Sequence, residues 1–277
     1  MTTPAPRFGT SSWTARGWEK TFYPSGLRPI DYLEFYSREF DTVEADVTYY
    51  RIPGPDMVAR WNDVTPDDFL LSAKFPRSIV HAGDGARPDP DRVLAPAHIA
   101  QDTARFLDAM RPMRDKIGAL VLQFPYFNRT TFQGPGPFLE RLDRYLENLP
   151  SDYRYAVEIR NSRWIDHQFI EVLRHHGVAR VLVDLPYMPD PEELRDVDSL
   201  VTTDFSYLRL IGNRKEVEAK AKTFDAVVID HGERLSRWTE VIHSVVERVP
   251  RLFIYANNHF AGHAPDTIRD LQSRVGA

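Results

Sequence analysis

The sequence predicts an α/β protein of the TIM-type (β/α)₈-barrel class, folded as a single domain over residues 1–277. From Arg7 onward, short β-rich segments alternate with longer segments of helical periodicity, which is the pattern of repeated βα units. Eight β-rich segments can be counted, and eight parallel strands close a barrel. The length of 277 residues also agrees with an ordinary barrel of about 250 residues.

The expected strands are short and end at turn residues. They cover Phe8–Ser12, Thr42–Asp46, Phe69–Lys74, Ala119–Gln123, Tyr155–Ile159, Ala179–Asp184, Tyr207–Leu210 and Leu252–Asn257. Three of them end in a polar residue followed by Phe or Leu and then Pro: Lys74-Phe75-Pro76, Gln123-Phe124-Pro125 and Asp184-Leu185-Pro186. Because Pro has no N–H to donate to a sheet, it marks where the strand stops and leaves the polar side chain on the last pleat.

The segments between the strands carry apolar residues at steps of three and four, which predicts amphipathic helices. These stripes lie in residues 30–40, 99–110, 138–149, 169–173, 235–246 and 267–271. Gly177 is expected to cap the fourth helix at its carboxyl end, and Pro265 to begin the last helix.

Three segments fit the repeat less well. Residues 1–6 are expected to be a flexible N-terminus, and residues 80–96, rich in Gly, Asp and Pro, a long loop near the functional site. Residues 212–222 are highly charged and lead into the apolar segment Phe224–Ile229, which fits either an extra strand or the start of a helix.

The composition is that of a globular protein with a large core. Hydrophobic residues make up 42% and charged residues 27% of the chain, close to the averages for soluble domains. The net charge of −5 gives no overall field that attracts a polyanion. The chain has no cysteine, no secretion signal at Met1–Gly9 and no apolar run near the ~20 residues that span a bilayer, so we expect a soluble cytoplasmic protein without a membrane partner; its oligomeric state stays open.

The residues that end the strands carry the candidate chemistry, because the carboxyl ends of barrel strands collect on one face. Residues two apart on a strand share a face, so Glu158 and Arg160 are expected to point the same way, as are Glu44 and Asp46. The ionisable and polar groups at these ends are Glu44, Asp46, Lys74, Gln123, Glu158, Arg160, Asp184, Arg209, Asn257 and Asn258.

Lys74, Arg160 and Arg209 come from three different strands and are expected to clamp a phosphate or carboxylate group. Glu158 and Asp184 are then expected to transfer protons, with Lys74 as a third catalytic group. The competing interpretation is purely structural: a ring of salt bridges would tie the barrel mouth together, since a buried charge must be paired.

Two other functions remain open. Glu44, Glu158, Asp184, His81 and His259 are all potential metal ligands, although the cations among them count against a metal site. No cofactor is predicted, since no GxGxxG, phosphate-binding loop or GxSxG motif occurs, but a divalent metal stays open. A single-stranded nucleic acid or a protein partner would be bound by aromatic and basic side chains, namely Trp13, Trp18, Tyr50, Trp164, Arg51 and Arg77.

Several short motifs occur in one order along nearly the whole chain. They are Gly9-Thr10-Ser11-Ser12-Trp13, Gly17-Trp18, Phe22-Tyr23-Pro24, Phe40-Asp41-Thr42-Val43-Glu44, Thr48-Tyr49-Tyr50-Arg51-Ile52-Pro53, Phe75-Pro76-Arg77 with His81, Leu122-Gln123-Phe124-Pro125, Val157-Glu158-Ile159-Arg160 with Trp164, and Tyr207-Leu208-Arg209. Together they resemble the YecE-like family, also called domain of unknown function 72 (DUF72).

The resemblance implies a (β/α)₈ barrel and no established activity. The chain departs from the family pattern after the last two strands, where it has Ile211 and Asn257-Asn258-His259. With the family positions included, the expected ligand-binding set is Glu44, Tyr50, Arg51, His81, Gln123, Arg160, Trp164, Arg209, Asn257 and Asn258.

The leading hypothesis is therefore an enzyme that uses acid/base chemistry on a small polar, anionic ligand at the carboxyl-terminal face of the barrel. A nucleic-acid or protein binding module and a metal-dependent hydrolase are the alternatives. Each depends on charged groups of separate strands converging at one end of a closed barrel.

Overall fold

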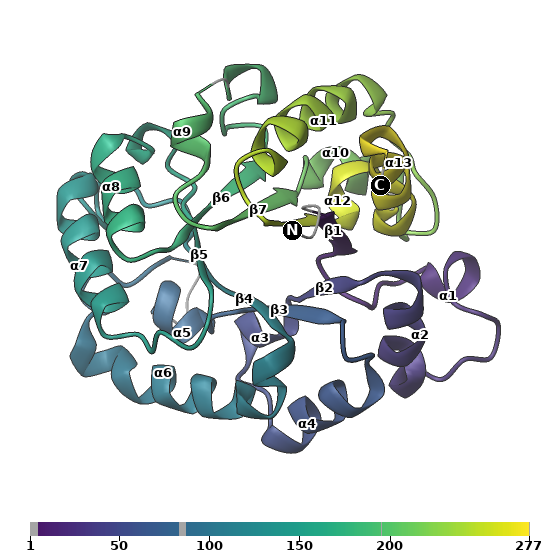
Figure 1. The fold of residues 1–277 in the computed structure, drawn as a ribbon, viewed down its shortest axis with the longest axis horizontal. Coiled ribbons are helices and arrows are strands. Elements are labelled where there is room, and N and C mark those ends of the chain that lie inside the picture. Colours follow the sequence, from purple (N-terminus) through teal and green to yellow (C-terminus); the bar gives the residue numbers. More distant parts are fainter. Residues whose placement is uncertain (1–4, 83–86, 195, 277) are drawn as a thin grey trace.

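The sheet of this protein is an eight-stranded parallel barrel in the computed structural model, which describes residues 5–82, 87–194 and 196–276. The strand order is β1-β8-β7-β6-β5-β4-β3-β2, and the strands surround the centre with the helices outside (Figure 1). The strands are β1 Ala5–Thr10, β2 Thr42–Ala45, β3 Leu70–Lys74, β4 Ile117–Gln123, β5 Tyr155–Glu158, β6 Ala179–Asp184, β7 Phe205–Leu210 and β8 Arg251–Ala256. The predicted fold class is confirmed.

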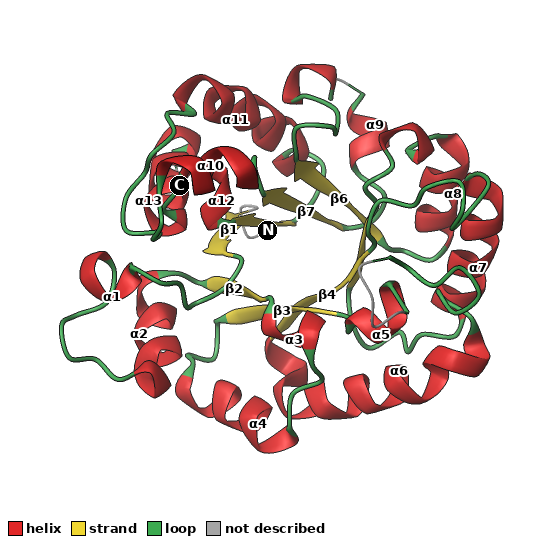
Figure 2. Ribbon diagram, turned by 180° about the vertical axis from the view of Figure 1, so that it is seen from behind, coloured by secondary structure: helices red, strands yellow, loops and turns green. Residues whose placement is uncertain are grey.

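Helices cover the outer face of the sheet all around (Figure 2). The longer ones are α2 Tyr32–Glu39, α4 Pro55–Val64, α6 Pro96–Met110, α7 Pro135–Glu147, α8 His167–His175, α11 Gly232–Val246 and α13 Ala264–Val275. The shorter ones are α1 Trp18–Thr21, α3 Val47–Tyr50, α5 Arg77–Val80, α9 Val197–Leu200, α10 Arg214–Lys220 and α12 Asn258–Ala261. Four of the longer helices begin with Pro at the first or second position, where the missing N–H costs nothing.

The first strand begins earlier than the sequence indicated. Ala5 pairs with Arg251 and Pro6 with Leu252, so β1 starts three residues before the expected Phe8. Two of the residues expected to form a flexible N-terminus therefore lie in the sheet, and residues 1–4 are outside the described part of the chain.

Of the two remaining segments, the charged residues 212–222 form mainly helix α10, Arg214–Lys220, whereas the other has little regular structure. The expected loop over residues 80–96 is irregular where it is described, from His81 to Ala82 and from Arg87 to Ala95, and residues 83–86 lie outside the described residues. The apolar segment Phe224–Ile229 is neither a strand nor a helix. Its backbone instead bonds to the loop before α1, where the N–H of Phe224 donates to the carbonyl of Arg16 at 2.8 Å, and to the end of α12, where the N–H of Val228 donates to the carbonyl of Ala261 at 2.7 Å.

Strand alternation sorts the side chains into two cores. One face of the strands lines the barrel interior with Ala119, Val121, Ala156, Val181, Val183, Tyr207, Phe253 and Tyr255. The other face packs against the helices in a larger cluster. Because this alternation has a period of two residues, it decides which polar residues at the strand ends reach the barrel mouth.

Side chains close the barrel where its two end strands, β1 and β2, lie side by side (Figure 1). The hydroxyl of Tyr36 accepts a hydrogen bond from the N–H of Thr10 at 2.8 Å and donates to the carbonyl of Thr42 at 3.2 Å. A Cβ on Gly9 would lie 2.0 Å from that same carbonyl oxygen, so only glycine permits this close approach. The Tyr36 hydroxyl thus takes the place of a backbone hydrogen bond between β1 and β2. We call this junction of the two end strands the seam.

None of the helices in the described residues is long and apolar enough to cross a membrane.

Replacing Tyr36 with Phe tests the seam. We expect Y36F to lower the free energy of unfolding by about 1–3 kcal/mol, because it leaves a buried backbone N–H without its partner. Chemical denaturation measures the change. The control is Y32F, since Tyr32 stacks on Tyr23 with ring centroids 3.9 Å apart and its hydroxyl makes no hydrogen bond within the described residues. Equal stability of Y36F and wild type would contradict the assignment.

Candidate functional site

A buried arginine occupies the centre of the barrel mouth. Arg209, on β7, is only 1% exposed. Its Nη2 donates to Glu44 Oε1 at 2.7 Å, and its Nη1 donates to the side-chain oxygen of Gln123 at 2.7 Å and to Glu158. One guanidinium group therefore joins strands β2, β4, β5 and β7.

Glu44, on β2, is fully buried and has several donors around it. Besides Arg209 it accepts a hydrogen bond from the Tyr207 hydroxyl at 2.7 Å, and the Nζ of Lys74 lies 3.3 Å from Oε1. Burial alone would raise the pKa of Glu44, but the positive charges of Arg209 and Lys74 outweigh it and lower the pKa to about 2. Glu44 is therefore ionised at any physiological pH.

Glu158, on β5, is also fully buried and ionised. One oxygen pairs with Arg209, and the other accepts from Arg160 Nε at 2.9 Å. Burial opposes ionisation, but the charges of Arg209 and Arg160 prevail and lower its pKa. As predicted from the two-residue spacing, Glu158 and Arg160 point the same way.

The carboxylate of Asp46 contacts the ammonium group of Lys74, and it differs from the two glutamates. Its side chain is 29% exposed, against 0% for Glu44. Burial of its carboxyl group raises the pKa of Asp46, and the neighbouring charge of Glu44 adds to this effect, although Lys74 opposes both. Asp46 is thus the carboxyl group of the mouth that is both partly exposed and raised in pKa.

The ions of the mouth form a neutral set that we call the charged layer: Arg209, Lys74 and Arg160 with Glu44, Asp46 and Glu158. Three positive charges offset three negative ones. The layer by itself therefore gives no net attraction for an anion, and any such attraction must come from other residues.

An arginine-rich pocket of about 410 Å³ lies beside the carboxyl ends of β2 and β3. Among the described residues that line it are four arginines and one carboxylate, Asp102, which lies 3.5 Å from Arg105. Tyr50, with 79% of its surface exposed, stands at its edge. The lining residues are Tyr50, Arg51, Ile52, Pro76, Arg77, Ser78, Ala82, Arg92, Asp102 and Arg105.

Tyr49 connects this pocket with the charged layer. Burial raises the pKa of its hydroxyl, and the positive charges of Arg77 and Arg160 oppose the rise. Because both arginines act on one hydroxyl group, Arg77 of the pocket and Arg160 of the charged layer belong to the same electrostatic environment.

Asp184 does not reach the mouth, and its expected convergence with Glu158 is wrong. Its carboxylate accepts hydrogen bonds from Arg234 Nε at 2.6 Å and from the Trp238 indole, both on α11 outside the barrel. The cause is strand alternation: Val183 and Leu185 face the barrel interior, so Asp184 must face the helices.

Most of the remaining expected binding residues are bonded to or packed against groups outside the charged layer. Asn257 Oδ1 caps α12 by accepting from the His259 N–H at 2.9 Å, and Asn258 Oδ1 accepts from the Trp18 indole at 3.1 Å. Trp164 packs on Phe127 with ring centroids 6.0 Å apart. His81 is buried at 4% exposure just after α5.

The aromatic surface expected for a nucleic-acid or protein partner does not form as one surface. Trp18 is 1% exposed and lies in the core, and Trp13 packs edge-on against Trp61. Of the four aromatic residues, Tyr50 is the one that projects fully from the surface.

Sequence reasoning left some functional residues out of the binding set. Asp46 could have been included, because it lies two residues after Glu44 and shares its face. Tyr207 is related to Arg209 in the same way. No sequence pattern indicated that Arg92 and Arg105 belong to the site, since they come from a loop and from the middle of α6.

Within the described residues, no group of three or more His, Asp or Glu side chains is placed to hold a metal ion. The five potential ligands named from the sequence are dispersed. Glu44 and Glu158 are occupied by cations, Asp184 faces α11, and His259 Nε2 lies 3.5 Å from Glu218.

The fold and site define a parallel (β/α)₈-barrel protein whose ionisable groups meet at the carboxyl ends of the strands. The chain belongs to the DUF72 family, described as proteins of unknown function, whose model matches residues 7–277. This confirms the resemblance based on the motifs.

Relatives cover nearly the whole chain. UPF0759 protein YecE of Escherichia coli K12 is 28% identical over 260 residues, covering 87% of this chain and 85% of YecE. The crystal structure of a DUF72 family protein from Thermotoga maritima is 25% identical with a TM-score of 0.70 and covers 96% of both chains. A DUF72 protein from Enterococcus faecalis is 18% identical with a TM-score of 0.66, over 98% of both chains.

The buried glutamates predict how stability depends on pH. The pKa of the Glu44 carboxyl group is lower in the folded than in the unfolded protein, so between these two pKa values the unfolded chain binds more protons. The free energy of unfolding therefore falls as the pH falls from about 4.5 toward 2. In E44Q one such group is gone, and we expect its free energy of unfolding to fall less steeply over this range. Urea titrations at several pH values measure the slope.

At neutral pH, E44Q itself should be less stable than wild type by about 3–5 kcal/mol, because it removes one partner from a buried ion pair. The control is E247Q, which removes a carboxylate that is exposed on the surface. An acid slope of E44Q equal to that of wild type and E247Q would refute the assignment of Glu44.

Proposed function

We propose that this protein is an enzyme that binds a small anionic ligand at the carboxyl-terminal mouth of the barrel and exchanges a proton with it through Asp46. The observation that carries the proposal is the Asp46–Lys74 pair. It is the part of the charged layer in which a carboxyl group is both partly exposed and raised in pKa. A group of this kind in a cleft is a candidate for acid/base work.

The buried part of the layer would serve as a rigid support. Arg209 holds Glu44 and Glu158 as ions with their oxygens occupied by donors, so neither has an oxygen available for a ligand proton. Glu158, expected from the sequence to transfer protons, is proposed instead to hold Arg160 in position. Lys74 keeps its proposed catalytic role, because its ammonium group stabilises the ionised form of Asp46.

A second pocket gives Asp46 access to a ligand. It has a volume of about 440 Å³ and is lined mainly by apolar side chains, including Trp13, Leu33, Met57 and Trp61, with Asp46 among them. This pocket and the arginine-rich pocket border opposite ends of the short helix α3, since Val47 lines one and Tyr50 lines the other.

The anionic group is proposed to bind to the arginines. Arg160 is 25% exposed and donates to Glu158 through Nε, and its other two nitrogen atoms donate no hydrogen bond within the described residues. The arginine-rich pocket supplies the surplus of positive charge that the neutral layer lacks. Arginine forks bind phosphate and carboxylate groups with paired hydrogen bonds, which favours phosphorylated or carboxylated ligands.

A thermal-shift screen with phosphorylated and carboxylated metabolites tests ligand binding. We expect at least one compound to raise the melting temperature of the wild type, and the R160A variant to lose about tenfold or more in affinity, because a charge-assisted hydrogen bond disappears. The control is R163A, which removes an exposed arginine three residues further along the chain.

The proposal would be contradicted if the compounds stabilised the wild type and R160A equally. It would also be contradicted if the protein bound single-stranded oligonucleotides at low salt but no small anion. The second result would instead favour the nucleic-acid alternative, whose phosphate contacts are strongest at low ionic strength.

The protonation of Asp46 can be followed directly. We expect its carboxyl carbon, observed by NMR, to titrate above the ordinary pKa of 3.8, and a bound anion to raise this pKa further by adding negative charge nearby. D46N identifies the signal by removing it, and D56N is the control for an exposed aspartate. Titration of Asp46 at or below 3.8 would remove it from the proposed proton transfer.

A further inference from the structure

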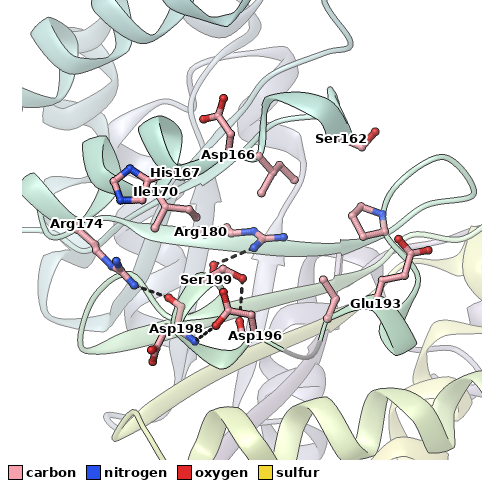
Figure 3. Close-up of a pocket in the computed structure, with 13 residues that line it drawn as sticks. Ser162, Asp166, His167, Ile170, Arg174, Arg180, Glu193, Asp196, Asp198 and Ser199 are labelled. Atoms are coloured by element: carbon pink, nitrogen blue, oxygen red, sulfur yellow. Dashed lines mark hydrogen bonds between the residues drawn. The ribbon is translucent and has the colours of Figure 1, made fainter.

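A separate pocket lies on the outer side of the barrel, between β6, helix α8 and the segment that leads from β6 toward β7 (Figure 3). Its volume is about 410 Å³, within the range of pockets that hold small molecules. Its walls combine apolar side chains, Ile165, Ile170 and Leu194, with several polar groups at the rim. No residue of the charged layer lines it.

Arg180 of β6 lies in the middle of this pocket (Figure 3). Because Ala179 and Val181 face the barrel interior, Arg180 points outward between the sheet and its helices. The residue is 5% exposed, and burial lowers the pKa of its guanidinium group to about 10, which still leaves it charged at neutral pH. It is therefore a buried cation on a face that otherwise packs apolar side chains.

The hydrogen-bonding capacity of Arg180 is only partly used. Nη1 donates to the carbonyl oxygen of Ser199 at 2.9 Å. Nε is buried without a hydrogen-bond partner among the described residues, and within the same residues no acceptor is bonded to Nη2. Nε and Nη2 form one edge of the planar group, the edge that a carboxylate fills with two parallel bonds.

Leaving the buried Nε of this edge without an acceptor costs free energy. A buried donor without a partner costs about 1–3 kcal/mol, and more when it belongs to a charged group. Arg209 shows the alternative within the same molecule, since both of its buried edges are filled by glutamates. The open edge of Arg180 therefore points to an acceptor that comes from outside the described part of the chain.

The charges around the pocket select the kind of acceptor. Four carboxylates surround it, those of Asp166, Glu193, Asp196 and Asp198, and none of them lies within salt-bridge distance of Arg180. Asp166 is occupied as the cap of α8, where it accepts from the Phe169 N–H at 3.0 Å. Arg174 at the rim is paired with Glu171 at 3.1 Å. A phosphate dianion would be repelled by this acidic rim more strongly than a carboxylate with one charge.

We propose that this outer pocket binds a small monocarboxylate with an apolar body, its carboxylate on the Nε–Nη2 edge of Arg180 and its body against Ile165, Ile170 and Leu194. The site is independent of the proposed function at the barrel mouth. An ammonium group on the ligand would face the acidic rim, so an aliphatic amino acid fits the same description.

The test uses the full chain labelled with ¹⁵N at arginine, with 4-methylpentanoate, leucine and inorganic phosphate as probes. We expect 4-methylpentanoate or leucine at millimolar concentration to shift the Nε–H signal of Arg180, and phosphate to leave it in place. R180K identifies the signal. Because Lys keeps the charge but not the paired donors, R180K should bind about tenfold more weakly, measured by calorimetry.

The matched control is R174M, which removes a charge from the same pocket but not from the open edge; its affinity should stay within about twofold of wild type. No shift of the wild-type Nε–H signal with either carboxylate, or equal loss of affinity in R174M and R180K, would overturn the proposal. A shift with phosphate alone would also overturn it.

Asp196 is the group in the pocket able to replace an external ligand, since its charge acts on Arg180 from beyond salt-bridge distance. If the Asp196 carboxylate bonded to the open edge in solution, the D196N substitution would shift the Arg180 Nε–H signal of the ligand-free protein. This shift would be as large as the one that ligand binding causes in the wild type. We expect D196N to leave that signal unchanged and to bind the carboxylate more tightly, because one repelling charge is gone. The opposite result assigns the edge to Asp196 and ends the proposal.

Discussion

The mouth of this barrel depends on the guanidinium group of Arg209. Removing an arginine and two carboxylates from water is costly, and only close, charge-assisted hydrogen bonds can repay that cost. Arg209 makes such bonds to Glu44 on β2 and to Glu158 on β5. The remaining ions follow from this arrangement, since Lys74 lies against Glu44 and Arg160 against Glu158. The position of each side chain is thus fixed by its partner as well as by its strand.

In this arrangement, the residues that hold the barrel mouth together differ from those proposed to contact a ligand. A group whose donors and acceptors are all used inside the protein has nothing left for a ligand, however strongly it is charged. We therefore place the proposed chemistry at the edge of the layer, where Asp46 and Arg160 are both partly exposed. The same reasoning explains why the proposed anion site needs arginines from outside the layer: the layer's own charges cancel.

Much of this site could be predicted from the sequence, and the failures have a physical cause. The β-rich segments, their Pro terminators and the two-residue spacing placed Glu44, Glu158, Arg160 and Arg209 correctly. The expectation for Asp184 failed because β6 is buried at every position, so its sequence lacks the alternation of buried and exposed residues that reveals which side chains point inward. Arg92 and Arg105 were not found because the loop before α6 and helix α6 itself, and not the strand ends, bring them to their pocket.

The two buried arginines of the barrel, Arg209 and Arg180, show how a structure distinguishes a structural charge from a binding charge. Both come from strands, both are nearly inaccessible, and neither stands out by residue type in the sequence. The difference lies in their acceptors: Arg209 has glutamates from two other strands, while Arg180 has one backbone carbonyl and an open edge. Since the cost of an unfilled edge is not repaid within the described chain, the filled arginine is assigned to stability and the open one to recognition.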